Sequence, residues 1–266
     1  MSFDAVIEHL LECACPSIQY RVRREVLGQS PFDAPLLDLQ PRILDDALVQ
    51  EVLNWQQPDG WFAWHFHGYP GTESAIRILS EKGVSPHHPS ILAGLNAIET
   101  YPDRLNRGIG KGGKTADEMA LGGQALIRAV VFAYAGVENC PFIREQITQS
   151  LEAFRAVIGI GNIHEVAEPY KEHLVFRAGA HWPCIYHLRL LAFTKGWRIA
   201  ENVHMLAQAL DRLAALSPIP PIYIRHKSQL IAPASFAMQN FNPDLSTLNP
   251  VGWMLWFHWM EMAARL

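Results

Sequence analysis

The stretch Trp55-Gln56-Gln57-Pro58-Asp59-Gly60-Trp61-Phe62 is the most informative part of this sequence. Pro58 fixes φ at the value that the second position of a tight turn needs, Asp59 can hydrogen-bond to its own backbone, and Gly60 supplies a positive φ. The Gln56 amide can bridge the end of one helix to the next connection. The stretch therefore predicts a tight turn between an amphipathic helix and a loop rich in aromatic residues and histidines. An ordinary Pro-Asp-Gly turn beside aromatic residues is the alternative.

The composition predicts a globular protein with a large core. The chain has 266 residues, of which 49% are hydrophobic, and it includes 8 Trp and 12 Phe. We expect a single domain over residues 1–266. The net charge is −4 and no basic block occurs, which argues against nucleic acid as a partner. No basic region followed by an apolar one begins the chain, and no apolar stretch is long enough to span a bilayer, so we expect a cytoplasmic protein without a membrane span.

Apolar residues recur at helical spacing along almost the whole chain. No segment alternates in the manner of a strand, and the nearest candidate, Tyr223–Arg225, is too short to build on. The sequence therefore predicts an all-α fold. The expected helices are Phe3–Cys13, Ser17–Leu27, Pro41–Gln56, Thr72–Lys82, Pro89–Glu99, Asp117–Ala135, Pro141–Ile158, Trp182–Thr194, Arg198–Leu216 and Val251–Arg265.

The order of these helices indicates two layers. From about Pro41 onward, amphipathic helices alternate with more apolar ones, as expected when outer helices meet water and inner helices do not. The connections out of the presumed inner helices are short, and the ones leading into them are long. If each short connection is a tight hairpin, the long ones gather on one face, at the N-termini of the inner helices; loops of this length are usually functional or disordered. These long connections are Gln57–Gly71, Tyr101–Thr115, Gly159–His181 and Ser217–Pro250, and Gln29–Gln40 forms a further expected loop.

The chain resembles a family at several places. The Gln56–Phe62 turn is similar to the Gln-x-Pro-Asp-Gly-x-Phe/Trp turn of the squalene-cyclase and protein-prenyltransferase superfamily. Residues 17–28 and 177–198 look like segments of bacterial prenyltransferase/squalene-oxidase-repeat proteins. The resemblance implies an α/α toroid, a barrel of paired inner and outer helices, complete or incomplete. The Asp-x-Asp-Asp motif of the terpene cyclases and the zinc ligands of the prenyltransferases have no counterpart, so family chemistry does not follow.

Aromatic walls with sparse polar groups are typical of small-molecule pockets, and the long connections supply both. Carboxylates and imidazoles among them are candidates for general acid–base work. The sequence leaves any cofactor unknown. The catalytic candidates are Glu73, Glu118 and His181, and the ligand-binding candidates are Trp61, Trp64, His65, His67, Tyr69, Arg177, Trp182 and Tyr186.

Each candidate has a structural alternative. Glu73 and Asp117–Glu118 lie in expected first helical turns, where the helix dipole alone favours acids. His65 and His67 on an extended segment would point the same way and would be metal ligands, but a third ligand is not identifiable. His187 on an apolar helix fits a hydrogen-bonded core residue. The four cysteines, Cys13, Cys15, Cys140 and Cys184, fit no common zinc or redox spacing.

Three functions remain open at the sequence level. The first is an enzyme, a lyase or hydrolase acting on a small polar or carbohydrate-like substrate. The second is a non-catalytic toroid that binds a ligand or a partner protein. The third, an isoprenoid cyclase or transferase, is disfavoured by the missing acid and zinc motifs. Fold analogy cannot choose between them.

Overall fold

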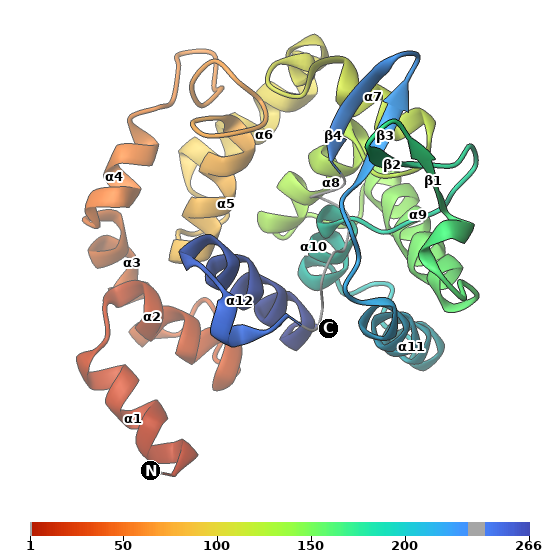
Figure 1. Cartoon of the computed structure of the whole chain (residues 1–266). Coiled ribbons are helices and arrows are strands. Elements are labelled where there is room, and N and C mark those ends of the chain that lie inside the picture. The colour runs from red at the N-terminus through yellow and green to blue at the C-terminus, as the bar shows by residue number, and fades with distance from the viewer. Residues whose placement is uncertain (1, 234–242) are drawn as a thin grey trace. The chain divides into compact units, whose positions relative to one another are not determined.

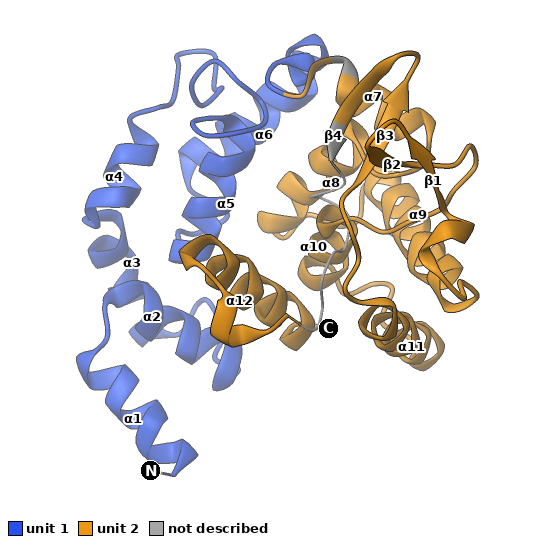
Figure 2. Cartoon of the chain, viewed as in Figure 1, with its two compact units in different colours: residues 1–108 blue, residues 109–266 orange. Residues whose placement is uncertain are grey.

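The computed structural model of the chain describes residues 2–233 and 243–266 (Figure 1). This part of the chain contains twelve α-helices and one four-stranded sheet, so the expectation of a mostly helical protein is confirmed. The chain divides into two compact units, residues 1–108 and residues 109–266 (Figure 2). Each unit is described by itself. That the chain is one domain stays a prediction.

Unit 1 is helical apart from its loops. The first helix and the helix after the aromatic loop begin and end where the apolar spacing predicts them. A π-helical turn, Val22–Val26, follows α2 directly. The helices are α1 (Phe3–Cys13), α2 (Pro16–Arg21), α3 (Ala34–Leu44), α4 (Ala47–Leu53), α5 (Thr72–Lys82) and α6 (Pro89–Thr100).

The expectation of one helix from Pro41 to Gln56 is wrong, as is that of a loop over Gln29–Gln40. The proline that marks a first helical turn is Pro35, because α3 begins at Ala34. Pro41 lies inside α3. Asp46 then has extended backbone, and its carboxylate accepts hydrogen bonds from the first amides of α4. Because Asp is a strong N-cap, it begins a second helix where the apolar periodicity alone indicates continuity.

Unit 2 carries the other six helices. The helix after Cys140 has the predicted bounds, but the predicted helix Asp117–Ala135 is wrong, because the chain leaves the helix after Glu118 and Ala120 and Gly122 have positive φ. The helices are α7 (Gly110–Glu118), α8 (Gln124–Tyr134), α9 (Pro141–Ile158), α10 (Ile185–Phe193), α11 (Ala200–Leu216) and α12 (Pro250–Ala264).

A small sheet in unit 2 corrects the all-α expectation. Its order is β1-β2-β3-β4, with antiparallel β1–β2 and β3–β4 hairpins joined by a parallel β2–β3 pairing. Each strand has only four or five residues, which is too few for a recognisable alternation of apolar and polar residues. The strands are defined by their hydrogen-bonded partners, which the sequence pattern does not show. The strands are β1 (Ala167–Tyr170), β2 (His173–Phe176), β3 (Ile222–His226) and β4 (Gln229–Pro233).

The sheet joins two of the long connections. β1 and β2 lie within Gly159–His181, and β3 and β4 lie within Ser217–Pro250, of which residues 234–242 lie outside the described residues. The parallel pairing places Leu174 opposite Ile222. Two connections for which the helix order predicts a common face are therefore hydrogen-bonded to each other.

The core of unit 2 is built around apolar helices. Most side chains of α8 and α10 are buried, α10 packs against α8, α9 and α12, and α11 packs against α9. The C-terminal helix α12 is apolar on all sides, yet Met254 and Phe257 are more than half exposed. No helix in residues 2–233 or 243–266 combines the length and the apolar character needed to cross a membrane.

Candidate functional site

The turn at Gly60 has the predicted geometry. Gly60 has φ +89°, and the Asp59 carboxylate accepts a hydrogen bond from the Trp61 amide at 3.3 Å. The Nε2 of Gln56 donates to the Gly60 carbonyl at 3.1 Å and to the Ser90 carbonyl in α6 at 2.8 Å. The predicted bridging role of the glutamine is confirmed, and it fixes the start of the aromatic loop against α6.

The far end of the loop is held to α5. The Thr72 hydroxyl donates to the Phe62 carbonyl at 3.2 Å and accepts from the Phe62 amide at 3.0 Å. The Glu73 amide donates to the Phe66 carbonyl at 2.8 Å. Because Trp61, Phe62 and Phe66 are fully buried, the loop is a packed part of unit 1.

Two arginines of the segment after α6 contact the loop. Arg104 forms an ion pair with Asp59, and its guanidinium lies 5.8 Å from the centre of the Trp61 ring. Arg107 lies 3.7 Å from the centre of the Trp64 ring, and its carbonyl accepts from the Phe66 amide at 3.0 Å. Arg–Trp stacking of this kind is a favourable cation–π contact. The first part of the Tyr101–Thr115 connection thus lies against the Gln57–Gly71 connection.

The loop places a histidine on a buried carboxylate. The Nδ1 of His67 lies 3.5 Å from a carboxylate oxygen of Glu73, and only 5% of the Glu73 side chain is exposed. The His67 side chain is 17% exposed, so this pair lies just below the surface. A carboxylate on Nδ1 orients an imidazole and selects its tautomer. Of the predicted residues, the structure brings Glu73 and His67 together, with Trp61 and Trp64 elsewhere on the same loop.

The other predicted residues of the loop lie outside this pair. His65 is exposed, and no group of three potential metal-ligating side chains occurs in the described part of the chain. Tyr69 is 66% exposed; its ring packs edge-on against Trp55 at 5.0 Å, and its hydroxyl donates to Glu51 at 3.3 Å. Among the described residues, the structure places no third potential ligand beside His65 and His67.

The predicted residues of unit 2 differ in burial. Trp182 is 1% exposed, and its Nε1 has no hydrogen-bond partner among the described residues. Tyr186 is buried under the Arg189 guanidinium, which lies 4.8 Å from the ring centre. His181 and Glu118 are exposed, and Arg177 is exposed with an ion pair to Glu168 at 3.3 Å. None of the contacts named here joins one of these side chains to another, and a site that they share stays a prediction.

Two titratable groups of unit 2 have structural roles. The Asp117 carboxylate accepts hydrogen bonds from the Ala125 amide at the start of α8, and burial raises its pKa. The Nδ1 of His187 accepts from the Cys184 amide at 2.8 Å, and full burial lowers the pKa of His187 to about 3. The interpretation of His187 as a hydrogen-bonded core residue is confirmed.

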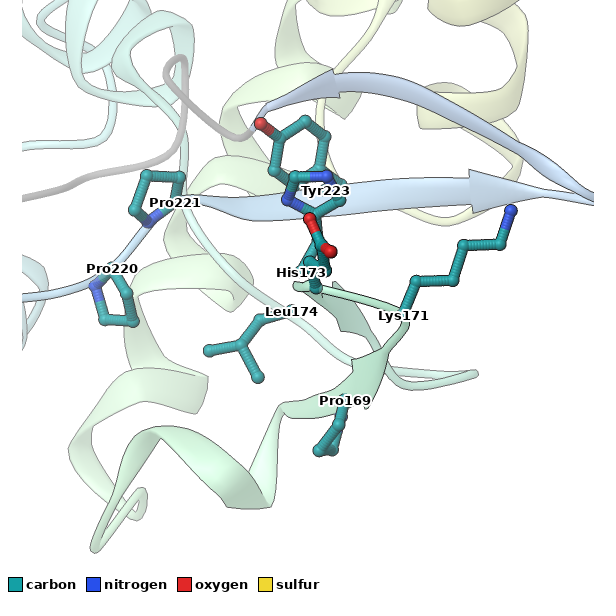
Figure 3. A pocket seen from close by; sticks show the side chains of 8 residues that line it. Pro169, Lys171, His173, Leu174, Pro220, Pro221 and Tyr223 are labelled. Carbon is teal, nitrogen blue, oxygen red and sulfur yellow. The ribbon is translucent and has the colours of Figure 1, made fainter.

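The sequence does not single out a cleft at one end of the sheet. The cleft has a volume of about 430 Å³ and is lined by residues of the β1–β2 hairpin and of the chain entering β3 (Figure 3). The rings of His173 and Tyr223 lie 4.7 Å apart within it. Only the pairing of β2 with β3 makes these residues neighbours, and the one sequence signal is the adjacent pair of prolines before β3. The lining residues are Pro169, Lys171, Glu172, His173, Leu174, Pro220, Pro221 and Tyr223.

Comparison with known proteins does not place the chain in a family. Comparison of the chain with models of protein families, with curated proteins and with solved structures finds no significant match to any of them.

Proposed function

We propose that the protein is a small-molecule-binding protein of the α/α-toroid class, and that the aromatic loop with the start of α5 is its ligand site. The His67–Glu73 pair is the observation that supports this proposal. A carboxylate held almost completely out of water, with an imidazole at 3.5 Å, is the arrangement that general acid–base catalysis uses. The ligand is a small polar or carbohydrate-like molecule, and the reaction is a hydrolysis or an elimination.

The surroundings of the pair suit such a ligand. Trp64 is 65% exposed, and Arg107 stacks on its ring at 3.7 Å. A sugar ring packs its C–H face on an exposed indole, and an arginine beside it donates to hydroxyl or carboxylate oxygens. In this proposal Trp64 and Arg107 hold the ligand, His67 transfers a proton, and Glu73 orients His67.

Turnover assays on a panel of chromogenic glycosides and of uronic-acid polysaccharides test the proposal. His67→Gln removes the proton-transferring imidazole, and Glu73→Gln removes the charge that orients it. Each change is expected to lower kcat by about 10²–10⁴-fold. Glu51→Gln is the control, because Glu51 contacts Tyr69 and is not part of the pair. Equal activity of His67→Gln and the wild type on a turned-over substrate would refute the assignment.

A non-catalytic binding protein is the second candidate, and the exposure of two predicted catalytic side chains favours it. Glu118 and His181 both lie on the surface of unit 2, where water solvates them. In that case no panel substrate is turned over, yet a sugar raises the melting temperature and Trp64→Ala abolishes the increase. No contact described here adds support for the third function, an isoprenoid cyclase or transferase.

A further inference from the structure

The cleft at the end of the sheet differs in chemistry from the aromatic loop of unit 1. Rings form much of its wall, namely the His173–Tyr223 pair, whose planes are tilted by 48° to each other, and the prolines of β1 and of the chain before β3. Its volume of about 430 Å³ falls within the range of about 300–1,000 Å³ that small-molecule sites occupy. A planar ring is the ligand group that such walls accommodate.

Two cations contact Tyr170, the last residue of β1. The Arg225 guanidinium lies 4.2 Å from the centre of the Tyr170 ring, and the Lys171 ammonium lies 5.5 Å from the centre of the same ring. Tyr170 is the register partner of His173 across the β1–β2 hairpin. The two cations therefore meet at the ring next to the His173–Tyr223 pair, on a chain whose net charge is −4.

The cleft has two chemically different ends. In Figure 3 the prolines 220 and 221 lie on one side of the His173–Tyr223 pair, and the Lys171 side chain extends toward the other side. Lys171 lines the cleft, whereas Arg225 contacts Tyr170 and is not one of the lining residues. An anionic group attached to a planar ring would place its charge toward Lys171, and toward Arg225 beyond the lining, while the ring packs on His173 and Tyr223. Glu172, which also lines the cleft, is an acceptor for an amino group on the ring.

We propose that this cleft binds a mononucleotide with an amino-substituted base. The base stacks on the His173–Tyr223 pair, Lys171 and Arg225 bind the phosphate, and Glu172 accepts a hydrogen bond from the exocyclic amine. Aromatic stacking holds bases in many nucleotide sites, and charge-assisted hydrogen bonds hold phosphates. The proposal is independent of the function proposed for the loop of unit 1, because no residue is shared.

Isothermal titration of the full chain with AMP, adenosine and inosine monophosphate tests the assignment. AMP is expected to bind saturably and about tenfold or more tightly than adenosine, since adenosine lacks the phosphate. Inosine monophosphate is expected to bind more weakly than AMP, because it has no exocyclic amine for Glu172. No saturable binding of AMP at millimolar concentration would overturn the proposal. Equally tight binding of indole-3-acetate would overturn the nucleotide assignment in favour of aromatic anions in general.

Variants of the two cations test whether they bind the phosphate. The double change Lys171→Gln and Arg225→Gln is expected to bring the affinity for AMP down to that for adenosine, whose own affinity stays the same. Lys227→Asn is the matched control, because Lys227 lies in the same β3–β4 hairpin with φ +55°, a conformation that asparagine tolerates, and does not contact the Tyr170 ring. An equal loss in the control would overturn the phosphate assignment.

The ring pair needs its own variant. His173→Ala alters an exposed side chain at the start of β2 and is expected to weaken AMP and adenosine together, by about tenfold. Circular dichroism and thermal unfolding of each variant show whether the fold is kept. Unchanged binding of both ligands by a folded His173→Ala protein would overturn the stacking role.

Discussion

The side-chain amide of Gln56 donates a hydrogen bond of 2.8 Å to the carbonyl oxygen of Ser90 in the first turn of α6. The same nitrogen donates to the Gly60 carbonyl at 3.1 Å. One side chain thus joins a turn to a helix that follows it much later in the chain. Removal of this amide leaves two part-buried carbonyl groups without this donor.

Gln56→Leu is therefore expected to lower the free energy of unfolding by about 1–3 kcal/mol. Gln57→Leu is the control, because Gln57 is exposed and its side-chain amide donates to the nearby Trp55 carbonyl at 3.2 Å, within the same turn. Denaturant unfolding of the two variants measures the difference. An equal loss in both would contradict the bridging role of Gln56.

Gly60→Ala is expected to destabilise unit 1 more than Gly28→Ala. Both glycines have positive φ, which costs an alanine about 1 kcal/mol. At Gly60 the added methyl would lie 2.6 Å from the Ala93 carbonyl oxygen, whereas at Gly28 it meets no atom within 4 Å. Thermal unfolding measures the two losses, and a similar shift in melting temperature for both would show that the approach to α6 is not tight.

Asp117→Ala is expected to lower the free energy of unfolding by about 0.5–2 kcal/mol, the usual effect of losing a helix cap. Its carboxylate accepts from the Ala125 amide, whereas the neighbouring Glu118 is exposed. Glu118→Ala is expected to change stability by less than about 0.5 kcal/mol. A larger loss for Glu118→Ala than for Asp117→Ala, measured by denaturant unfolding, would reverse the roles given to the two acids.

The stability of unit 2 is expected to fall in acid because of His187. Burial lowers its pKa from 6.5 to about 3, so the unfolded chain binds a proton that the folded chain does not. This contribution to stability is complete above pH 6.5 and is lost at about 1.4 kcal/mol per pH unit as the pH falls from 6.5 toward 3. Unfolding curves over this range measure the slope.

His187→Gln tests this assignment directly. Glutamine keeps an acceptor for the Cys184 amide and has no titratable proton in this range. The variant is expected to show a shallower dependence of stability on pH between 3 and 6.5. A slope identical to that of the wild type would mean that other groups cause the acid sensitivity.

The cysteines are expected to react at different rates. Cys13 and Cys15 are exposed, whereas Cys184 is buried and has a pKa raised by burial to about 11. Because the thiolate is the reactive form, a maleimide will label the first two within the native protein and Cys184 only after unfolding. Peptide mass spectrometry identifies the labelled positions. Native labelling of Cys184 as fast as of Cys13 would contradict its burial.

The sequence predicts local features of this fold better than distant pairings. The bounds of α5 and α9 follow from apolar spacing and from signals at their ends. The helix boundary before Ala47 depends on one N-cap residue, Asp46. The apolar spacing continues across this boundary and therefore does not predict it. The sheet is missed because its four- and five-residue strands find partners across two helices.

The same contrast applies to the sites. The aromatic loop is contiguous in sequence, so Trp64, His67 and Glu73 are recognisable as candidates from the order of residues alone. The detailed geometry of the loop cannot be predicted in this way, because the position of Arg107 on Trp64 depends on the path of the chain after α6. The cleft residues His173 and Tyr223 belong to separate connections and become neighbours only when β2 pairs with β3.

The parallel pairing of β2 with β3 also sets an order of events during synthesis. The β1–β2 hairpin leaves the ribosome before α10 and α11, and its partner β3 follows both helices. A parallel partner cannot be reached by a short turn, so the hairpin waits for the helical crossover to form. A chain that ends before Ile222 contains the residues of every helix from α1 to α11 but lacks Tyr223, so the complete cleft marks a late step of folding.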